Sequence, residues 1–342
     1  MKQAAGSRQQ AAKPGRAARA PRWVFRAGFL AACCLLPAAC LSGCMGLSTS
    51  RNPTPPADGK LIDVMPTSAE LVGYLNRRAE MVNSLATTEV DLDIKADGQT
   101  FSVHGDLHCQ KPRNFRLRAK KPVLRDVAAD FGSNDSEFWY YISEDRPPDL
   151  YHCAYTDLSR GTVRLPFPLH PDWVLEALGL GAPAPVGKPE EEEARGRRLE
   201  VKKTADNKFL DLYEHTRSLQ GQPILKVTRL NNFEARGSRP QVVGYYLYEA
   251  GGQRPVCQAT VAKVQYDAAS GTVIPQVIEI SWPAMKLSIT MTLDKVRVNS
   301  GNLASNPRLF ARPTYSGVRE VDLARGAPLM TPTGVQRAGA FR

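Results

Sequence analysis

The sequence predicts a mainly β protein of the α+β kind, in which a strongly curved antiparallel sheet forms a half-open barrel. Three observations predict this fold class. Between residues 89 and 120, apolar and polar residues alternate with a period of two, as in strands that bury one face. Short turn signals separate the alternating runs, which favours an antiparallel meander over a parallel α/β sheet. Only two segments have helical periodicity, so few helices are available to cover the sheet.

The first predicted element is an amphipathic helix over residues 68–85. Thr67 and Glu70 have the spacing of a capping box, in which the two side chains accept hydrogen bonds from free backbone N–H groups. Apolar residues recur at three- and four-residue steps along one face, namely Leu71, Leu75, Ala79, Val82 and Leu85. A short second helix is predicted from Pro171-Asp172 to Gly179, since proline suits the first turn and glycine the end of a helix.

The strands are predicted in two series within one domain over residues 63–300. Asp97-Gly98 is a hairpin turn signal, and Lys111-Pro112-Arg113 ends the strand that follows it. The first series is expected near residues 89–95, 101–109, 115–120, 127–131, 137–143 and 163–167. The second is expected near residues 199–203, 209–215, 224–231, 242–250, 257–266, 276–282 and 286–298.

Three segments are expected to lie outside the regular elements. Residues 181–198 contain proline, glycine and the run Glu190 to Glu193, and they are predicted to form an exposed loop; a linker between two domains is the alternative. Residues 44–62 include a stretch rich in proline, serine and threonine and are predicted to be a flexible tether. Residues 301–342 are expected to form an irregular C-terminal tail, except near Phe310.

Residues 1–43 have the plan of a secretory signal. Basic residues occur without any acidic residue up to residue 26, an apolar run extends from Phe29 to Leu41, and small residues precede Cys44. The apolar run is shorter than the roughly 20 residues that span a bilayer. The alternative frame, which ends at Cys40, has Pro37 where a branched aliphatic residue is expected.

Leu41-Ser42-Gly43-Cys44 resembles a bacterial lipobox. This resemblance implies cleavage before Cys44, a diacylglycerol on its sulfur and a further acyl chain, such as palmitate, on the new amino terminus. Two or more acyl chains make membrane attachment stable. Met45, rather than aspartate, follows the cysteine, and in such lipoproteins this implies the outer membrane, with the protein facing the periplasm. Ordinary cleavage or an uncleaved anchor is the alternative.

Removal of this signal changes the charge of the chain. The sequence has 45 basic and 34 acidic residues, for a net charge of +11. Seven of the basic residues lie in the signal, so 38 basic residues remain against 34 acidic ones, or +4. The basic excess is therefore mostly a targeting feature, and no nucleic-acid partner is expected.

Cysteine usage agrees with export. Four of the seven cysteines lie in or at the end of the signal, namely Cys33, Cys34, Cys40 and Cys44. Cys109, Cys153 and Cys257 remain, and whether two of them pair is left open because connectivity does not follow from sequence. No CxxC element is present, so neither a zinc or redox site nor another cofactor is expected.

The order of elements resembles the LolA/LolB family of lipoprotein carriers and acceptors, together with related mycobacterial lipid-binding lipoproteins. The resemblance extends over about residues 67–298. It rests on a capped helix ending in Asn83-Ser84-Leu85, on Gly105-Asp106-Leu107 ahead of KPRNFRL at residues 111–117, on a Gly-Ser-Asn-Asp turn before FWYY at residues 138–141, and on IPQVIEI at residues 274–280. It implies a half-closed sheet with helices as a lid across its concave side and acyl chains bound between them. The acidic loop and the C-terminal tail depart from the family plan, and no family binding residue is carried over.

A one-sided sheet with few helices either closes on itself or leaves part of its apolar face for a ligand. An apolar cavity suits acyl chains because each buried CH₂ contributes about 0.8 kcal/mol. The candidate ligand contacts are Leu71, Leu75, Val103, Leu107, Leu117, Trp139 and Trp173. Trp173 is expected in the lid. For any one of these residues, packing in a dry core is the favoured alternative.

The sequence contains no recognisable catalytic motif. His104, Asp106 and His108 share one strand face, as zinc ligands do, but polar residues on the wet face of a strand give the same pattern. His152, His170 and His215 are isolated, and no GxSxG, HExxH, P-loop or GxGxxG element occurs. We therefore expect neither a metal site nor an enzyme.

The sequence thus predicts a membrane-anchored lipoprotein that binds an acyl chain or another apolar lipid or lipoprotein moiety, in lipoprotein or lipid sorting. The first alternative is a structural envelope lipoprotein with a filled core that contacts another protein. The second is a hydrolase whose residues assemble from distant parts of the chain.

Overall fold

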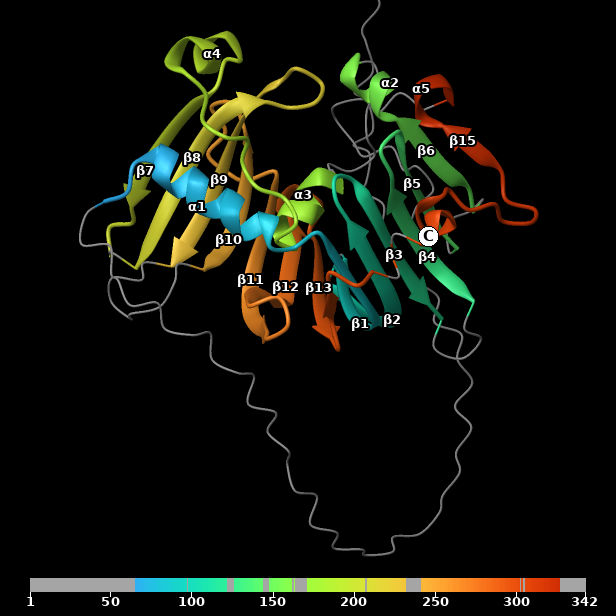
Figure 1. Ribbon diagram of the computed structural model, residues 1–342. Coiled ribbons are helices and arrows are strands. Elements are labelled where there is room, and N and C mark those ends of the chain that lie inside the picture. The colour runs from blue at the N-terminus through green and yellow to red at the C-terminus, as the bar shows by residue number, and fades with distance from the viewer. Residues whose placement is uncertain are drawn as a thin grey trace, which may run out of the picture.

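The protein is mainly β, with an open sheet of 15 strands and few helices among the residues that the structure describes (Figure 1). The computed structural model describes residues 65–96, 98–121, 126–143, 148–161, 163, 171–206, 208–231, 241–301, 303 and 305–326. The predicted signal, Cys44, the whole of the predicted tether and all but the first residue of the strand at 163–167 lie outside the described residues. The prediction of a mainly β fold is confirmed.

The first six strands form a meander in which each strand pairs with the next. They are β1 (Ser84–Ala96), β2 (Gln99–Gln110), β3 (Asn114–Lys120), β4 (Val127–Ser133), β5 (Glu137–Ile142) and β6 (Leu150–Ala154). Gly98 turns the chain between β1 and β2 at φ 81°, a left-handed conformation that glycine adopts without strain. The predicted break at Lys111 to Arg113 separates β2 from β3.

Seven strands form a second meander. They are β7 (Arg198–Lys203), β8 (Phe209–Arg217), β9 (Pro223–Asn231), β10 (Val242–Glu249), β11 (Cys257–Asp267), β12 (Thr272–Trp282) and β13 (Leu287–Asp294). β1 and β13 pair antiparallel, from Glu89 with Asp294 to Ala96 with Leu287, and this pairing joins both meanders into one sheet. The sheet begins at β15 and β6 and ends at β7, and these two edges do not pair with each other in the described part of the chain.

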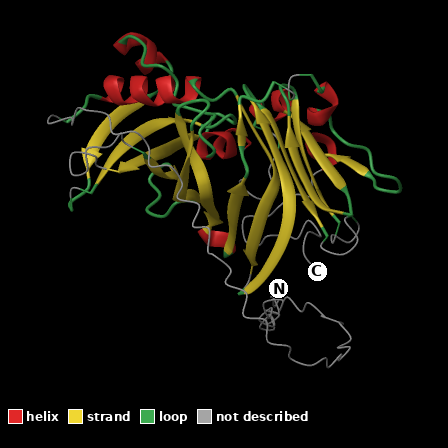
Figure 2. Cartoon of the chain, turned by 60° about the horizontal axis from the view of Figure 1, so that its bottom comes forward, coloured by secondary structure: helices red, strands yellow, loops and turns green. Residues whose placement is uncertain are grey.

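The helices are short apart from the first. They are α1 (Ser68–Glu80), α2 (Tyr155–Ser159), α3 (Pro171–Ala177), α4 (Pro189–Ala194) and α5 (Leu323–Gly326), with 3-10 turns η2 (Pro283–Met285) and η3 (Pro307–Phe310). Figure 1 shows α1 crossing β7 to β10, with α3 beside it over the middle of the sheet. Figure 2 shows the strands bending beneath the helices.

The helix α1 ends five residues before the predicted boundary. Its capping box is present: the backbone N–H of Glu70 donates to Thr67 Oγ1 at 3.2 Å, and that of Thr67 donates to Glu70 Oε2 at 2.8 Å. At the other end, Asn299 receives a hydrogen bond from the Asn83 N–H at 2.7 Å and donates one to the Met81 carbonyl at 2.8 Å. The distant Asn299 side chain thus stabilises the turn between α1 and β1. The sequence around the turn gives no sign of this contact.

One face of the sheet carries the largest apolar cluster. Inward residues of β1 to β3 and β10 to β13 pack there with residues of α3 and the segment after it, including Leu107, Phe115, Ile278 and Leu178. A separate cluster joins α1 to β7, β8 and β9. The apolar stripe predicted on the helix is therefore buried against the second meander.

The loop predicted over residues 181–198 is partly ordered. It contains α4 and the first residue of β7. Glu190, Glu191 and Glu193 are not buried, but the Glu192 side chain is only 12% exposed and lies 3.2 Å from Arg197. The Gly187 N–H also donates to Glu192 at 2.7 Å. One of the four glutamates is thus a structural residue and not part of a solvated run.

The C-terminal segment is more regular than predicted. The strand β15 (Glu320–Asp322) pairs parallel with β6, and η3 and α5 lie on either side of it in the chain. A two-residue strand, β14 (Arg297–Val298), pairs with the start of β1. Tyr315 stacks on Tyr141 of β5 with ring centroids 4.4 Å apart. The contacts that order this segment come from distant strands, so the segment's own composition did not predict them.

Candidate functional site

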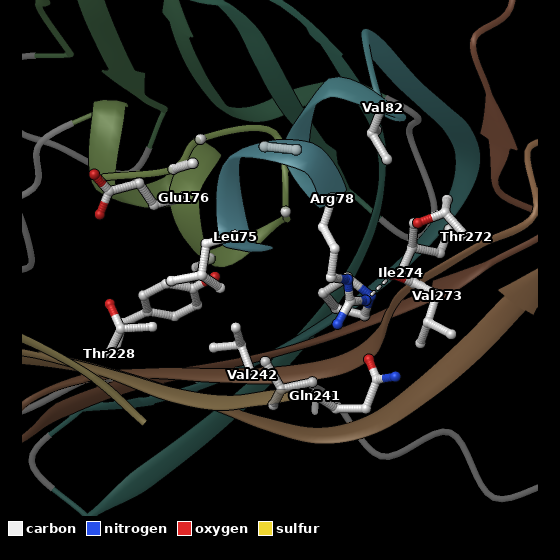
Figure 3. A pocket seen from close by; sticks show the side chains of 18 of the residues that line it. Leu75, Arg78, Val82, Glu176, Thr228, Gln241, Val242, Thr272, Val273 and Ile274 are labelled. Carbon is white, nitrogen blue, oxygen red and sulfur yellow. Dashed lines mark hydrogen bonds between the residues drawn. The ribbon is translucent and has the colours of Figure 1, made fainter. Parts of the chain in front are cut away.

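The candidate site is a cavity of about 60 Å³ between α1, the segment after α3 and strands β9 to β12. Figure 3 shows Leu75 and Arg78 of α1 facing Val242 and Ile274 of the sheet across it. Most of its walls are apolar side chains, and the polar and charged ones include Arg78, Glu176, Gln241, Thr228 and Thr272. The cavity therefore suits an apolar ligand more than a polar one.

A second cavity of about 40 Å³ lies beneath α3, against β9 to β12. Trp173 lines this α3 cavity, and Glu176, Ala177, Thr228 and Tyr245 line both cavities. The two spaces thus meet at the C-terminal half of α3. Burial raises the pKa of Tyr245, so its hydroxyl stays neutral at physiological pH.

The position of α1 follows from its amphipathic sequence. Leu71, Val72 and Leu75 are buried and pack against Leu212 and Leu230 of the sheet. The capping box fixes the start of the helix, because it satisfies backbone N–H groups that have no partner within the helix. The helix therefore forms one wall of the first cavity.

The helix α3 is held by an ion pair near each end. Near its start, Asp172 Oδ1 lies 3.3 Å from Arg113 Nε, beside the first meander. Near its end, Glu176 Oε1 lies 2.5 Å from Lys226 Nζ of β9. Burial lowers the pKa of Lys226, but Glu176 and Glu214 together outweigh burial, so the net shift is upward. The lysine is thus charged when α3 is seated on the sheet.

Arg197 fixes the chain segment that follows α3. Its side chain is 4% exposed and donates to Glu214 Oε1 at 2.6 Å and to the Ala184 carbonyl at 2.8 Å. Glu214 in turn lies 3.9 Å from Lys226. Arg197, Glu214, Lys226 and Glu176 therefore form a continuous chain of alternating charges beside the cavities.

The structure brings two of the seven predicted contacts to the cavities. Leu75 lines the first cavity and Trp173 the second. Leu71 belongs to the cluster between α1 and the sheet. Val103, Leu107 and Leu117 lie in the same large cluster as Trp173 but line neither cavity.

Trp139 lies away from this site. It packs with Tyr141 and Leu150 against Tyr315 and Val318 of the C-terminal segment. Its neighbour Tyr140 belongs to another cluster, with Phe138 and Tyr151. Because successive strand residues point to opposite faces, Trp139 is on the face of β5 opposite to Tyr140. We therefore leave Trp139 out of the candidate site.

The three residues weighed as metal ligands each have other neighbours. His104 Nδ1 lies 2.5 Å from Asp91 Oδ1, and Lys120 Nζ lies 2.5 Å from Asp106 Oδ2. Burial lowers the pKa of His108. Within the described residues, no group of three histidine, cysteine, aspartate or glutamate side chains is arranged to hold a metal ion.

Cys109, Cys153 and Cys257 are free, buried thiols. Cys109 and Cys257 lie in the large cluster, whereas Cys153 lies in the cluster with Phe138 and Tyr151. Burial raises the pKa of Cys153 and of Cys257 to about 12. Thiols with such pKa values are unreactive at neutral pH, so their role is packing.

Comparison with known proteins gives structural neighbours only. No protein-family model and no curated sequence matches the chain. Its neighbours among solved structures are DUF1329 and LolA superfamily proteins. These include the family that the sequence pattern resembles.

The matches to three of these neighbours each cover more than two thirds of this chain. A DUF1329 family protein from Desulfovibrio piger has 8% identity and a TM-score of 0.45, and the match covers 68% of this chain and 92% of that one. A putative outer membrane lipoprotein-sorting protein domain from Vibrio parahaemolyticus has 14% identity and a TM-score of 0.44, covering 71% and 98%. A LolA superfamily protein from Nitrosomonas europaea has 12% identity and a TM-score of 0.41, covering 72% and 99%.

Sequence reasoning missed the charged residues beside the cavities. One signal for them exists: Ile224, Lys226, Thr228 and Leu230 share the inward face of β9, so a lysine lies in a row whose other members are buried or half-buried. Its partner Glu176 is 50 residues away on a short helix, and alternation along a strand does not indicate such a pair.

In the described parts of the chain, no helix is long and apolar enough to cross a membrane.

Proposed function

We propose that the chain is a membrane-anchored lipoprotein that binds an acyl chain or another apolar lipid moiety between the sheet and a lid formed by α1 and α3. The observation that carries this proposal is the pair of adjoining cavities under the two helices. In this proposal Cys44 is lipidated, the protein faces the periplasm from the outer membrane, and it acts in the sorting of lipids or lipoproteins. It works by burial and helix movement, without covalent chemistry.

The ligand contacts in this proposal begin with Leu75 and Trp173, which line the two cavities. Ala177 and Tyr245, which line both, would contact the chain where it passes beneath α3. Leu71, Val103, Leu107 and Leu117 would contribute only if a longer ligand parts the helices from the adjacent clusters. Transfer of apolar surface from water onto these side chains provides the binding energy.

Binding of a whole acyl chain requires the lid to move. A cavity needs roughly 10–15 Å³ to hold one water molecule. The two cavities, of about 60 Å³ and 40 Å³, therefore admit only a few groups of that size. The described conformation is therefore closed. The helix α3 is the part suited to open, since it has only seven residues and its two ion pairs are partly exposed. The pair at its start, Asp172 with Arg113, is about one third exposed and contributes about 1 kcal/mol or less, so opening at that end costs little.

The same small volumes support the second candidate function, a structural envelope lipoprotein whose sheet is filled by its own side chains. In that case the protein has no exchangeable ligand, and its edges or acidic segment contact another protein. Ligand binding by the purified domain separates the two functions.

A cavity-blocking substitution tests the proposal. We expect the chain from residue 60 onward to bind a fluorescent fatty acid and to release it when oleate is added. Ala177 is 2% exposed and lines both cavities, so Ala177→Phe fills the shared space. We predict that this change weakens oleate binding about tenfold, which corresponds to about 1.4 kcal/mol. The measurement is the oleate concentration that displaces half of the probe.

Ala262→Phe is the matched control, because Ala262 of β11 is exposed and lines neither cavity. It should bind oleate as the parent protein does. Circular dichroism of both variants would verify the fold. Absence of binding in the parent protein, with no lipid in its organic extract, contradicts the proposal and favours the structural function. Equal binding by both variants would place the ligand elsewhere.

A further inference from the structure

Two side chains with hydroxyl groups lie next to each other where the two cavities meet. Tyr245 of β10 and Thr228 of β9 are direct cross-strand partners in the antiparallel register. The side chains of such partners lie side by side on one face of a sheet, with Cβ atoms about 4.5–5.5 Å apart. Both residues line the first cavity and the α3 cavity. We call them the hydroxyl pair.

A β-bulge turns Tyr245 toward the cavities. Val242 pairs with Leu230 and the next pair is Gly244 with Arg229, so β10 has one extra residue at this point. Val242 and Tyr245 both line the first cavity, although residues three apart on a regular strand point to opposite faces. Bulges commonly re-aim a side chain beside a functional site. The extra residue therefore brings the Tyr245 side chain next to that of Thr228.

Within the described parts of the chain, neither hydroxyl of the pair has a hydrogen-bond partner. Thr228 is only 6% exposed, and Figure 3 shows it on the sheet side of the cavity, facing the helix side where Leu75 lies. Most buried polar groups in proteins have a partner, so two adjacent hydroxyls without one indicate a site for a ligand atom. Each hydroxyl has one proton to donate.

The charges beside the hydroxyl pair compensate each other. Glu176 lines both cavities, and its Oε1 lies 2.5 Å from Lys226 Nζ. Burial, and then the charge of Glu176, raises the pKa of Tyr245, so its hydroxyl keeps the proton that it donates. A neutral donor beside a compensated ion pair does not select for an ionised head group. The junction of the cavities therefore suits an uncharged acceptor with hydrocarbon around it.

We propose that the hydroxyl pair binds the carbonyl oxygen of an acyl ester, whose hydrocarbon extends into both cavities when α3 opens. This inference rests on the proposed function and names the ligand class of that site. Apolar side chains continue on both sides of the pair, with Leu75 and Ile274 in the first cavity and Ile280 in the α3 cavity. An ether of equal length fits the same space but has no carbonyl oxygen, so it leaves the buried hydroxyls unpaired.

The test compares an ester probe with an ether probe on the full-length chain. The probes are a monoacylglycerol and the matching monoalkylglycerol, each with a photoactivatable group at the end of its chain, so they differ only in the carbonyl. The protein is held in vesicles of ether-linked phosphatidylcholine, because this bilayer contains no competing ester. Mass spectrometry identifies the labelled cavity peptides. We expect half-maximal labelling of the parent protein at an ester concentration about tenfold below that of the ether, since two hydrogen bonds are gained.

Conservative substitutions assign this preference to the hydroxyl pair. Tyr245→Phe and Thr228→Val each remove one hydroxyl and nearly keep the shape of the side chain, so each should lower the ester preference to about threefold. The double variant should show no preference. Tyr248→Phe, on the same strand but outside both cavities, should keep the tenfold preference. The two probes are compared within each variant, so a general loss of affinity cancels from their ratio.

Unlabelled competitors identify the source of the ester. A diacylated lipopeptide and a phosphatidylethanolamine with the same acyl chains both contain the ester group. The competitor that halves ester labelling at the lower concentration is the preferred ligand. Equal concentrations would mean that the hydroxyl pair recognises the ester alone, whichever lipid contains it.

Two results overturn the inference. One is equal half-maximal concentrations of ester and ether in the parent protein; the other is an undiminished ester preference in the double variant. Both leave the proposed function standing, because labelling of the cavity peptides still occurs. Absence of cavity labelling by both probes is a different outcome, and it contradicts the proposed function itself together with this inference.

Discussion

The most consequential single residue missed by the sequence analysis is Lys226, a lysine on the inward face of β9. Its side chain is 20% exposed and lies between two carboxylates, 2.5 Å from Glu176 and 3.9 Å from Glu214. Taking such charges out of water costs free energy that their attraction only partly offsets. These ion pairs therefore determine where α3 lies on the sheet more than they stabilise the fold.

Removal of the lysine alone should be destabilising. Lys226→Met leaves Glu176 without a cation near Glu214, which keeps Arg197, and we expect the free energy of unfolding to fall by about 2 kcal/mol, a value reduced for the partial exposure of the site. The double variant Lys226→Met/Glu176→Leu should recover more than half of this loss, since no carboxylate of α3 then lacks a partner. Urea denaturation measures both. Lys202→Met is the control, because Lys202 is 54% exposed and pairs with Glu200.

The difference in stability between the parent protein and Lys226→Met should depend on pH in a defined direction. The folded protein raises the pKa of Lys226, although burial alone would lower it. A raised lysine pKa means that the folded state binds the proton more tightly, so the stabilisation is complete below the unfolded pKa of about 10.5 and is lost as the pH rises through the folded value. The difference between the urea midpoints of the parent protein and of Lys226→Met should stay constant from pH 7 to 9 and disappear above pH 10.5. A difference that persists at pH 12, or one no larger than that of Lys202→Met, contradicts the assignment.

Sequence reasoning located part of the candidate site. Leu75 and Trp173 were predicted because helical spacing identifies the buried side of each helix, and both line cavities. Trp139 could not be placed in this way. Every residue of β5 after Glu137 is apolar, so alternation does not tell its two faces apart. Only the cross-strand partners of Trp139, Gly132 and His152, establish the face on which it lies.

At the scale of elements, α3 connects the two meanders. Its first turn pairs with Arg113 beside β3, and its last turn pairs with Lys226 of β9. Arg113 is itself fixed over the Tyr155 ring, with its Cζ 4.5 Å from the ring centroid. A seven-residue helix has little stability of its own. The position of α3 is therefore set by these contacts and by its apolar face.

Weakening one of these contacts should loosen α3 selectively. Asp172→Asn removes the charge that faces Arg113, and both side chains are about one third exposed. We expect the backbone amides of α3 to exchange with solvent about threefold faster, while those of α1 stay unchanged, because α1 packs in a separate cluster. Hydrogen exchange with mass spectrometry resolves the two segments. Asp135→Asn, at an exposed turn, is the control; faster exchange in both variants would show that α3 is not held by Asp172.

The predicted elements were accurate where the sequence itself contains the signal. The capping box of α1 and the alternating strands from β1 to β3 depend on local spacing, and both are present. Five helices and strands of the described residues were missed: β6, α2, α4, β15 and α5. The strand β6 has only five residues, and β15 has three and exists through its pairing with β6. Elements formed by long-range pairing have too few residues to show a period of their own.

At the scale of the whole molecule, the C-terminal segment covers the outer face of the first meander. The Tyr315 hydroxyl donates to Asp130 Oδ2 at 2.6 Å, and Arg116 Nη2 donates to the same oxygen at 2.7 Å. Asp130 is completely buried. Arg116 also donates to the Leu309 carbonyl at 2.9 Å, so the segment satisfies a buried ion pair as well as covering Trp139 and Leu150. An open sheet has two faces to protect, and the lid covers only one of them.

Truncation distinguishes this structural role from that of a dispensable tail. A chain that stops at Gly301 loses η3, β15 and α5, which exposes Trp139 and removes the Tyr315 hydroxyl from Asp130. Exposed aromatic surface together with a weakened buried ion pair should cost about 4 kcal/mol, or roughly 10 °C in the unfolding temperature of a domain this size. A chain that stops at Gly326 retains every described contact and should melt like the full protein. Equal melting temperatures for the two truncated chains would contradict this role.

Tyr315→Phe provides a milder case, since it keeps the ring on Tyr141 and loses only the hydroxyl. The buried carboxylate of Asp130 then lacks one donor, so we expect the free energy of unfolding in urea denaturation to fall by about 1–2 kcal/mol.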